Sequence, residues 1–123
     1  MPKIPVISII DDDRAVRDAT ESLVRSLGYR PYTFASAEEF LNSERLHDTS
    51  CLISDLQMPG MSGTELQARL IAGGHSLPVI IITAFPADNA RARAMGAGAV
   101  CFLSKPYDDE DLIRCIDTAL KSA

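Results

Sequence analysis

Polar and charged residues follow four separate apolar runs of the sequence. They are Asp11 and Asp12, Asp55, Thr83 and Lys105. Carboxylates held about 5 Å apart repel by roughly 3 kcal/mol per pair at an effective dielectric of about 20. A lysine and a divalent cation such as Mg²⁺, which accepts a few carboxylates, waters and a phosphate, would neutralise them. These residue types favour phosphoryl transfer to an aspartate, because an Asp carboxylate serves as the nucleophile in aspartyl-phosphate chemistry.

Asp55 is the candidate nucleophile because it is the acid that lies alone on its loop. The apolar residues 51–53 precede it, and a Pro- and Gly-rich stretch, residues 57–63, follows. Taken alone, this pattern is equally typical of a turn residue or a helix cap. The carboxyl end of a strand in an open α/β sheet is, however, where ligands bind. The decision therefore depends on whether the other polar residues end strands of the same sheet.

Short apolar runs alternate with helical patterns along the whole chain. The expected strands are residues 6–10, 29–34, 51–53, 79–82 and 100–103. Regular alternation predicts a parallel sheet with right-handed crossovers and helices on both faces. Pro31 removes a backbone donor, which places the second strand at an edge. We therefore expect one α/β domain over residues 1–123, a doubly wound five-stranded parallel sheet of order 2-1-3-4-5 with five helices.

Several helix ends are marked by capping residues. We interpret Asp13 as the cap of the first helix rather than a metal ligand, and Ser36 with Glu39 as a capping box. Asp108 is expected to cap the last helix. The helix near residues 88–95 carries mostly alanine on its inner face, so it should be weakly held. Residues 45–50 are expected to form a polar loop.

The composition excludes several classes of protein. A net charge of −5 and a pI near 4.9 argue against a nucleic-acid surface, which requires clustered Lys and Arg. No apolar stretch approaches 18 residues and no signal peptide is visible at the start of the sequence, so we expect a soluble, cytoplasmic chain without a membrane partner.

The cysteines and histidines form no recognisable ligand motif. Cys51, Cys101 and Cys115 are odd in number, widely spaced and set among apolar neighbours, which predicts buried, reduced thiols. His47 and His75 share no motif and are interpreted as surface residues. Neither histidine is expected to bind a metal.

Four motifs together resemble those of a known family. They are Ile-Ile-Asp11-Asp12-Asp13, Ile-Ser-Asp55-Leu-Gln-Met-Pro-Gly-Met-Ser-Gly63, Ile-Ile-Thr83-Ala84 and Leu-Ser-Lys105-Pro106. In their order and spacing, over nearly the whole chain, they strongly resemble the receiver domains of two-component response regulators. The resemblance implies a flavodoxin-like, CheY-like fold. It also implies a phosphorylation-dependent signalling switch rather than a conventional enzyme.

The resemblance assigns a role to each residue of the acidic site. Asp55 would accept a phosphoryl group from a sensor histidine kinase or a phosphotransfer protein. Asp12 would ligate Mg²⁺ directly, Asp11 would act mainly through bound water, and Gln57 would offer its backbone carbonyl. The implied cofactor is therefore Mg²⁺.

The same resemblance implies a switch that reports phosphorylation. Thr83 and Lys105 would contact the phosphoryl oxygens, and the Lys105–Pro106 bond is expected to be cis. Inward movement of Thr83 would open space for Phe102 to rotate in, so that the face of the fourth helix, fifth strand and fifth helix changes. Phe85 is bulky enough to shield the phosphate from water.

Two further stretches of the sequence bear on the partners of this chain. Residues 36–41 and 95–100 look like the subgroup whose receivers usually precede a LuxR-type helix-turn-helix domain, so an output domain or a homodimer formed on phosphorylation is expected. The alternative is a receiver-like interaction module that works without phosphorylation. A flavin module is disfavoured because three acids after the first strand would repel a phosphate. A phosphatase on a related fold usually has a second acid two positions after the nucleophile. Gln57 occupies that position here, which disfavours a small-molecule hydrolase.

Overall fold

The computed structural model describes residues 4–86 and 88–121 as five strands, five α-helices and one 3₁₀ helix. In chain order they are β1 (Val6–Ile10), α1 (Arg14–Ser26), β2 (Arg30–Phe34), α2 (Ala37–Leu41), η1 (Glu44–His47), β3 (Cys51–Asp55), α3 (Gly63–Ala72), β4 (Val79–Thr83), α4 (Asp88–Gly96), β5 (Cys101–Ser104) and α5 (Asp109–Lys121). None of these helices has both the length and the hydropathy of a membrane span.

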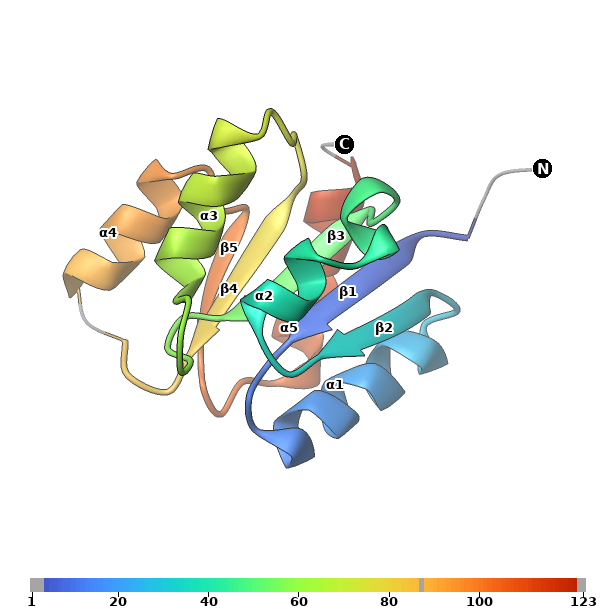
Figure 1. Cartoon of the computed structure of the whole chain (residues 1–123). Coiled ribbons are helices and arrows are strands. Elements are labelled where there is room, and N and C mark those ends of the chain that lie inside the picture. Colours follow the sequence, from blue (N-terminus) through green and yellow to red (C-terminus); the bar gives the residue numbers. More distant parts are fainter. Residues whose placement is uncertain (1–3, 87, 122–123) are drawn as a thin grey trace.

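The strands form one parallel sheet of order β2-β1-β3-β4-β5, which confirms the order expected from the sequence (Figure 1). β2 lies at an edge, where Pro31 pairs with Ile7. β3 and β4 are buried along their whole length, because helices cover both of their faces.

Two apolar cores lie on the two faces of the sheet. On one face, α2, α3 and α4 contribute Phe40, Leu66 and Ala94. On the other, α1 and α5 contribute Val24 and Ile116. This doubly wound arrangement leaves the carboxyl ends of all five strands along one rim, where the site is built.

The first two helices begin at the caps that the sequence predicts. The Asp13 carboxylate accepts hydrogen bonds from the backbone amides of Ala15 at 2.9 Å and Val16 at 3.4 Å. Ser36 Oγ accepts from the amide of Glu39 at 3.1 Å. The Glu39 side chain accepts from the amide at position 35, one residue before the cap, so the second half of the capping box is displaced.

α3 and α4 are joined by a polar side chain as well as by apolar packing. Gln67 is 2% exposed, and its Nε2 donates to the backbone carbonyl of Ala94 at 3.1 Å. Its Oε1 is buried and has no hydrogen-bond partner among the described residues. The Gln67 Nε2 group thus provides one polar contact to α4, whose residues in the core, Ala90 and Ala94, are small.

Two expectations from the sequence are wrong in detail. The polar loop expected at residues 45–50 begins inside η1, because Ser43 Oγ accepts a hydrogen bond from the Arg45 amide and closes a tight turn. Cys101 and Cys115 are not reduced thiols but form a disulfide. α5 packs against β5 so that their Cα atoms lie 5.9 Å apart, within the usual range for a disulfide. Cys51 is free and buried, as expected.

Candidate functional site at the carboxyl ends of the strands

The five acceptor-site residues proposed from the sequence all lie at one rim of the sheet. Asp11 and Asp12 follow β1, Asp55 ends β3, Thr83 ends β4 and Lys105 follows β5. β1, β3 and β4 are adjacent strands, so their last residues lie close together at this rim. The lysine is supplied by β5, on the far side of β4.

Lys105 bridges two of the carboxylates. Its Nζ donates to Asp11 Oδ2 at 2.9 Å and to Asp55 Oδ2 at 3.3 Å. The three side chains are 16%, 6% and 8% exposed for Lys105, Asp11 and Asp55 respectively, so the pairing is shielded from bulk water. One ammonium group leaves the cluster of acids with an excess of negative charge.

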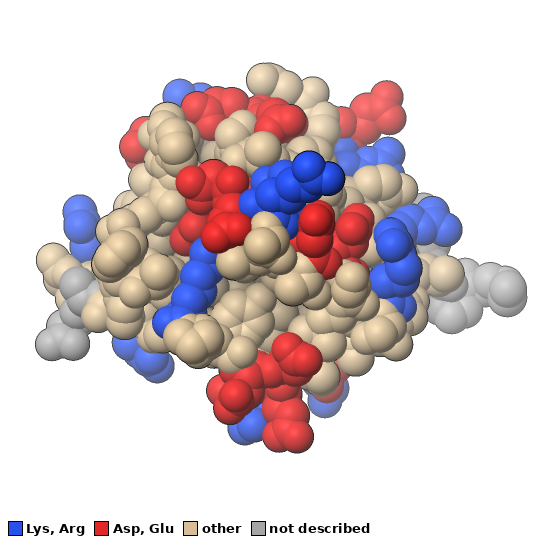
Figure 2. Space-filling model, turned by 90° about the horizontal axis from the view of Figure 1, so that it is seen from below, with Lys and Arg blue, Asp and Glu red and all other residues tan. Residues whose placement is uncertain are grey.

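Asp11, Asp12 and Asp55 each offer a carboxylate oxygen, and these oxygens lie within 4.8 Å of one another. Asp12 is exposed, whereas the other two are buried, so the cluster is open to solvent on one side. Seen from below, the molecule presents several groups of acidic side chains with basic ones between them (Figure 2). An all-oxygen donor set with uncompensated negative charge fits Mg²⁺, which keeps waters on its remaining positions.

The environment shifts two pKa values at this site. Burial raises the pKa of Asp55 above its ordinary value, and the Asp11 charge adds to the rise, although Lys105 and the backbone amide of Gln57 oppose it. Burial alone would lower the pKa of Lys105, but its hydrogen bond and charge interaction with Asp11, together with the Asp55 charge, raise it. The lysine therefore stays charged, and a further cation would relieve the cost of an ionised Asp55.

The loop after Asp55 is held tightly against the strand end. Leu56 donates its amide to the Ile82 carbonyl at 2.8 Å and accepts from the Gly63 amide at 2.8 Å. A side-chain carbon on Gly63 would lie 2.8 Å from the Asp55 carbonyl oxygen and 3.0 Å from Leu56 Cα. Only glycine permits this approach, which fixes the backbone that presents Asp55.

Thr83 is fully buried, and its Oγ1 accepts a hydrogen bond from the Phe85 amide at 3.0 Å. The backbone of Thr83 also accepts from the Lys105 amide at 2.8 Å, which joins the ends of β4 and β5. The Phe85 side chain is 67% exposed. Phe102 is 8% exposed and belongs to the same apolar core as Ala94 and Ala99.

Two supporting residues of the site were not foreseen from the sequence. Arg17 donates from Nη1 to the backbone carbonyl of Asp11 at 2.7 Å, and the Tyr107 hydroxyl lies 2.8 Å from Thr20 Oγ1. Arg17 is half-buried on α1, and the sequence shows its helical spacing but not its contact with the backbone of Asp11. The Lys105–Pro106 bond is cis, as expected.

Comparison with known proteins identifies the family. The family model described as "Response regulator receiver domain" matches residues 7–117 of this chain. The response regulator protein TmoT of Ectopseudomonas mendocina is 45% identical over 118 residues, 96% of this chain and 54% of that protein. The transcriptional regulatory protein FixJ of Bradyrhizobium diazoefficiens is 37% identical over 117 residues, 95% of this chain and 57% of that protein.

Solved structures of response regulators have the same fold as this chain. The response regulator StyR superposes with a TM-score of 0.90 at 39% identity, covering 98% of this chain and 61% of that chain. FixJ-N superposes with a TM-score of 0.88 at 32% identity, covering 99% and 98%. The chain thus spans only about half the length of the curated relatives it matches, and nearly the whole of the FixJ-N structure.

Proposed function

This chain belongs to the response regulator receiver domain family, and from that premise we propose that Asp55 accepts a phosphoryl group from a sensor histidine kinase or a phosphotransfer protein. The observation that carries the proposal is the Lys105 ammonium, held between the carboxylates of Asp11 and Asp55 beside the exposed Asp12. Phosphoryl transfer depends mainly on positioning and on neutralising charge. This rim supplies both.

In the transfer, a carboxylate oxygen of Asp55 attacks phosphorus as the bond between phosphorus and the donor group breaks. Mg²⁺, when bound, would neutralise charge on the phosphoryl oxygens. Asp12 and Asp11 would hold it, Asp11 mainly through water, with Asp55 and the backbone carbonyl of Gln57 as further ligands. Lys105 remains charged and shifts from the carboxylates toward a phosphoryl oxygen. The protein modifies its own side chain, so it acts as a signalling domain rather than as an enzyme on a separate substrate.

The switch that reports this event would begin at Thr83. Its hydroxyl can donate to a phosphoryl oxygen while it releases the Phe85 amide that it now accepts from. Thr83 leads into α4, which a half-satisfied Gln67 joins to α3. We expect Phe102, already buried, to repack beneath α4, which changes the face formed by α4, β5 and α5.

The partners follow from this face. Residues 1–123 would act as a single receiver unit that controls an output domain or partner, or that forms a homodimer on phosphorylation. A LuxR-type helix-turn-helix domain is the output class that the sequence favours. Because the relatives are about twice as long as this chain, that output remains part of the proposal. An interaction module independent of phosphorylation would not require the charge arrangement around Lys105.

Beryllofluoride with Mg²⁺, which mimics an aspartyl phosphate, tests the switch. Amide exchange should change in the Asp55 loop and in residues 84–106 that the structure describes. Asp55→Asn should abolish both responses. A response confined to the Asp55 loop would contradict the proposed switch face. No response at either place would contradict phosphoacceptance itself and favour the phosphorylation-independent alternative.

A further inference from the structure

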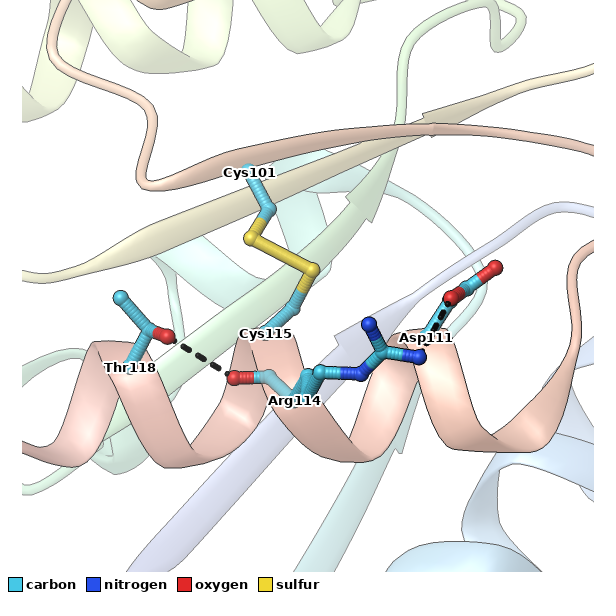
Figure 3. Close-up of a disulfide and its surroundings, with 5 residues drawn as sticks. All are labelled: Cys101, Asp111, Arg114, Cys115 and Thr118. Carbon is cyan, nitrogen blue, oxygen red and sulfur yellow. Dashed lines mark hydrogen bonds and ion pairs between the residues drawn. A yellow bond between two sulfur atoms is a disulfide. The ribbon is translucent and has the colours of Figure 1, made fainter.

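A disulfide ties the strand that leads into Lys105 to the last helix. Cys101 is the first residue of β5, and Cys115 lies near the middle of α5, 14 residues later (Figure 3). We propose that this pair is a reversible redox modification site, closed by low-molecular-weight disulfides such as oxidised glutathione, and that the closed bond restricts the movement of α5 against β5. No residue of the phosphoacceptor site takes part in it.

The three cysteines differ in their access to such reagents. Cys51 is fully buried, and burial raises the pKa of its thiol to about 12, so it supplies almost no thiolate. Cys115 is 6% exposed, whereas Cys101 is half-buried on the outer strand of the sheet. Exchange therefore starts at Cys101, and Cys115 is already in place to complete the bond.

The exchange balances in two steps. The Cys101 thiolate attacks the oxidant's S–S bond, forming a mixed disulfide and releasing one thiol. The Cys115 thiolate then attacks the Cys101 sulfur and releases the second thiol. The protein loses two electrons and two protons, and the oxidant becomes two thiol molecules. An excess of a small thiol runs the same steps in reverse.

The bond constrains α5 but is not needed to hold it in place. Leu112, Ile116 and Ala119 are fully buried and pack in the core on this face of the sheet. Reduction therefore leaves α5 docked. It removes the covalent link at Cys115. The neighbouring exposed residues of α5 are polar, and Arg114 pairs there with Asp111 at 3.2 Å (Figure 3).

The disulfide joins two of the elements that form the α4–β5–α5 face. β5 carries Phe102 directly after Cys101, and Lys105 follows the end of the strand. One end of β5 is thus tied to α5 while the other faces Asp55 through Lys105. This consequence rests on the proposed switch: the oxidised form should accept a phosphoryl group normally but show a smaller change in α5.

The first test needs no phosphate. Oxidised glutathione should make the chain lighter by two hydrogen atoms, with a Cys101–Cys115 peptide link, and raise the Tm by on the order of 10 °C relative to the reduced chain. Cys51→Ser, the control, should behave in the same way, and Cys101→Ser should show neither effect. A stable glutathione adduct on wild-type protein without the internal bond, or no reaction at all, would overturn the proposed redox site.

The second test separates this inference from the proposed function. Beryllofluoride is added to the oxidised and reduced wild-type chain and to Cys101→Ser, and backbone chemical shifts are compared. We expect equal changes in the Asp55 loop of all three and at least twofold smaller changes in α5 of the oxidised form. Equal α5 changes in both redox forms would overturn the restriction by the bond while leaving the proposed function standing. Absence of any change in the reduced form would overturn the proposed function and the coupling together, and the first test would still decide the redox site.

Discussion

The amine of Lys105 lies 3.3 Å from Oδ2 of Asp55, although 50 residues separate them and β4 lies between their strands. The lysine side chain must therefore extend past the end of β4 to reach the acid. Its 2.9 Å contact with Asp11 fixes it there. A single cation thus joins the ends of three strands, and it stands where a phosphoryl group on Asp55 would need a positive charge.

Lys105→Met should destabilise the chain in the absence of divalent cations. It leaves two nearly buried carboxylates without their cation, and breaking a fully buried pair costs about 3–5 kcal/mol, so about 2 kcal/mol is expected at this partly open rim. Urea denaturation measures the loss, and added Mg²⁺ should recover much of it. Lys121→Met at the exposed end of α5 is the control and should change little. Equal losses in the two variants would contradict the bridging role of Lys105.

Asp55→Asn should stabilise the Mg²⁺-free protein, and by more as the pH rises. Because burial raises the pKa of Asp55 in the folded state, the folded chain holds this proton more tightly than the unfolded chain does. The resulting stability is present at low pH and is lost as the pH rises from the ordinary value of 3.8 through the raised pKa.

Thermal denaturation between about pH 3 and pH 7 measures this effect. The Tm difference between Asp55→Asn and wild type should be small at the acid end and reach a few degrees at the neutral end. The control is Asp117→Asn on the exposed side of α5. A difference that is the same at every pH would show that the substitution acts by packing and not by charge.

Gly63→Ala should disturb the backbone that presents Asp55. The new Cβ would lie 2.8 Å from a backbone oxygen of Asp55, which cannot move aside as a flexible side chain would. We expect a loss of about 2 kcal/mol in the free energy of unfolding, together with slower phosphorylation. Gly96→Ala, which meets nothing within 4 Å, should be within about 0.5 kcal/mol of wild type. Similar behaviour of the two variants would refute the close approach.

Asp13→Ala tests whether Asp13 caps α1 rather than binding the metal with Asp11 and Asp12. Asp13 caps α1, so its loss should cost about 1 kcal/mol in urea denaturation, and Asp13→Asn should retain most of the stability. Neither variant should reduce Mg²⁺ affinity or phosphorylation by more than about twofold. A large drop in Mg²⁺ affinity for Asp13→Ala would reassign Asp13 to the metal site.

The sheet order and the grouping of Asp11, Asp55 and Lys105 could be predicted from the sequence, because each residue directly follows a short apolar run. Parallel strands deliver their last residues to one rim whatever the details of helix packing. Pro31 lacks a backbone N–H donor, which indicated that its strand lies at an edge of the sheet. The cap at Asp13 is equally local, since it needs only the first turn of a helix.

The features that escaped prediction depend on how helices are rotated and placed. Whether Cys115 faces Cys101 is decided by the packing of α5 on β5, and their spacing of 14 residues carries no such information. The hydrogen bond from Gln67 to the Ala94 carbonyl and the buried position of Phe102 likewise depend on where α4 lies. His47 and His75 were expected to be unrelated surface residues, yet their rings lie 6.0 Å apart because η1 and the α3–β4 connection meet.

Intact mass after treatment with acetyl phosphate tests the central claim most directly. With Mg²⁺, wild type should gain the mass of one phosphoryl group, and peptide mapping should place it on Asp55. The gain should disappear without Mg²⁺ and in Asp55→Asn, whereas Gly96→Ala should be labelled as wild type is. Labelling that persists in Asp55→Asn, or no labelling of a folded, Mg²⁺-bound wild-type chain, would contradict the assignment of Asp55 as the phosphoacceptor.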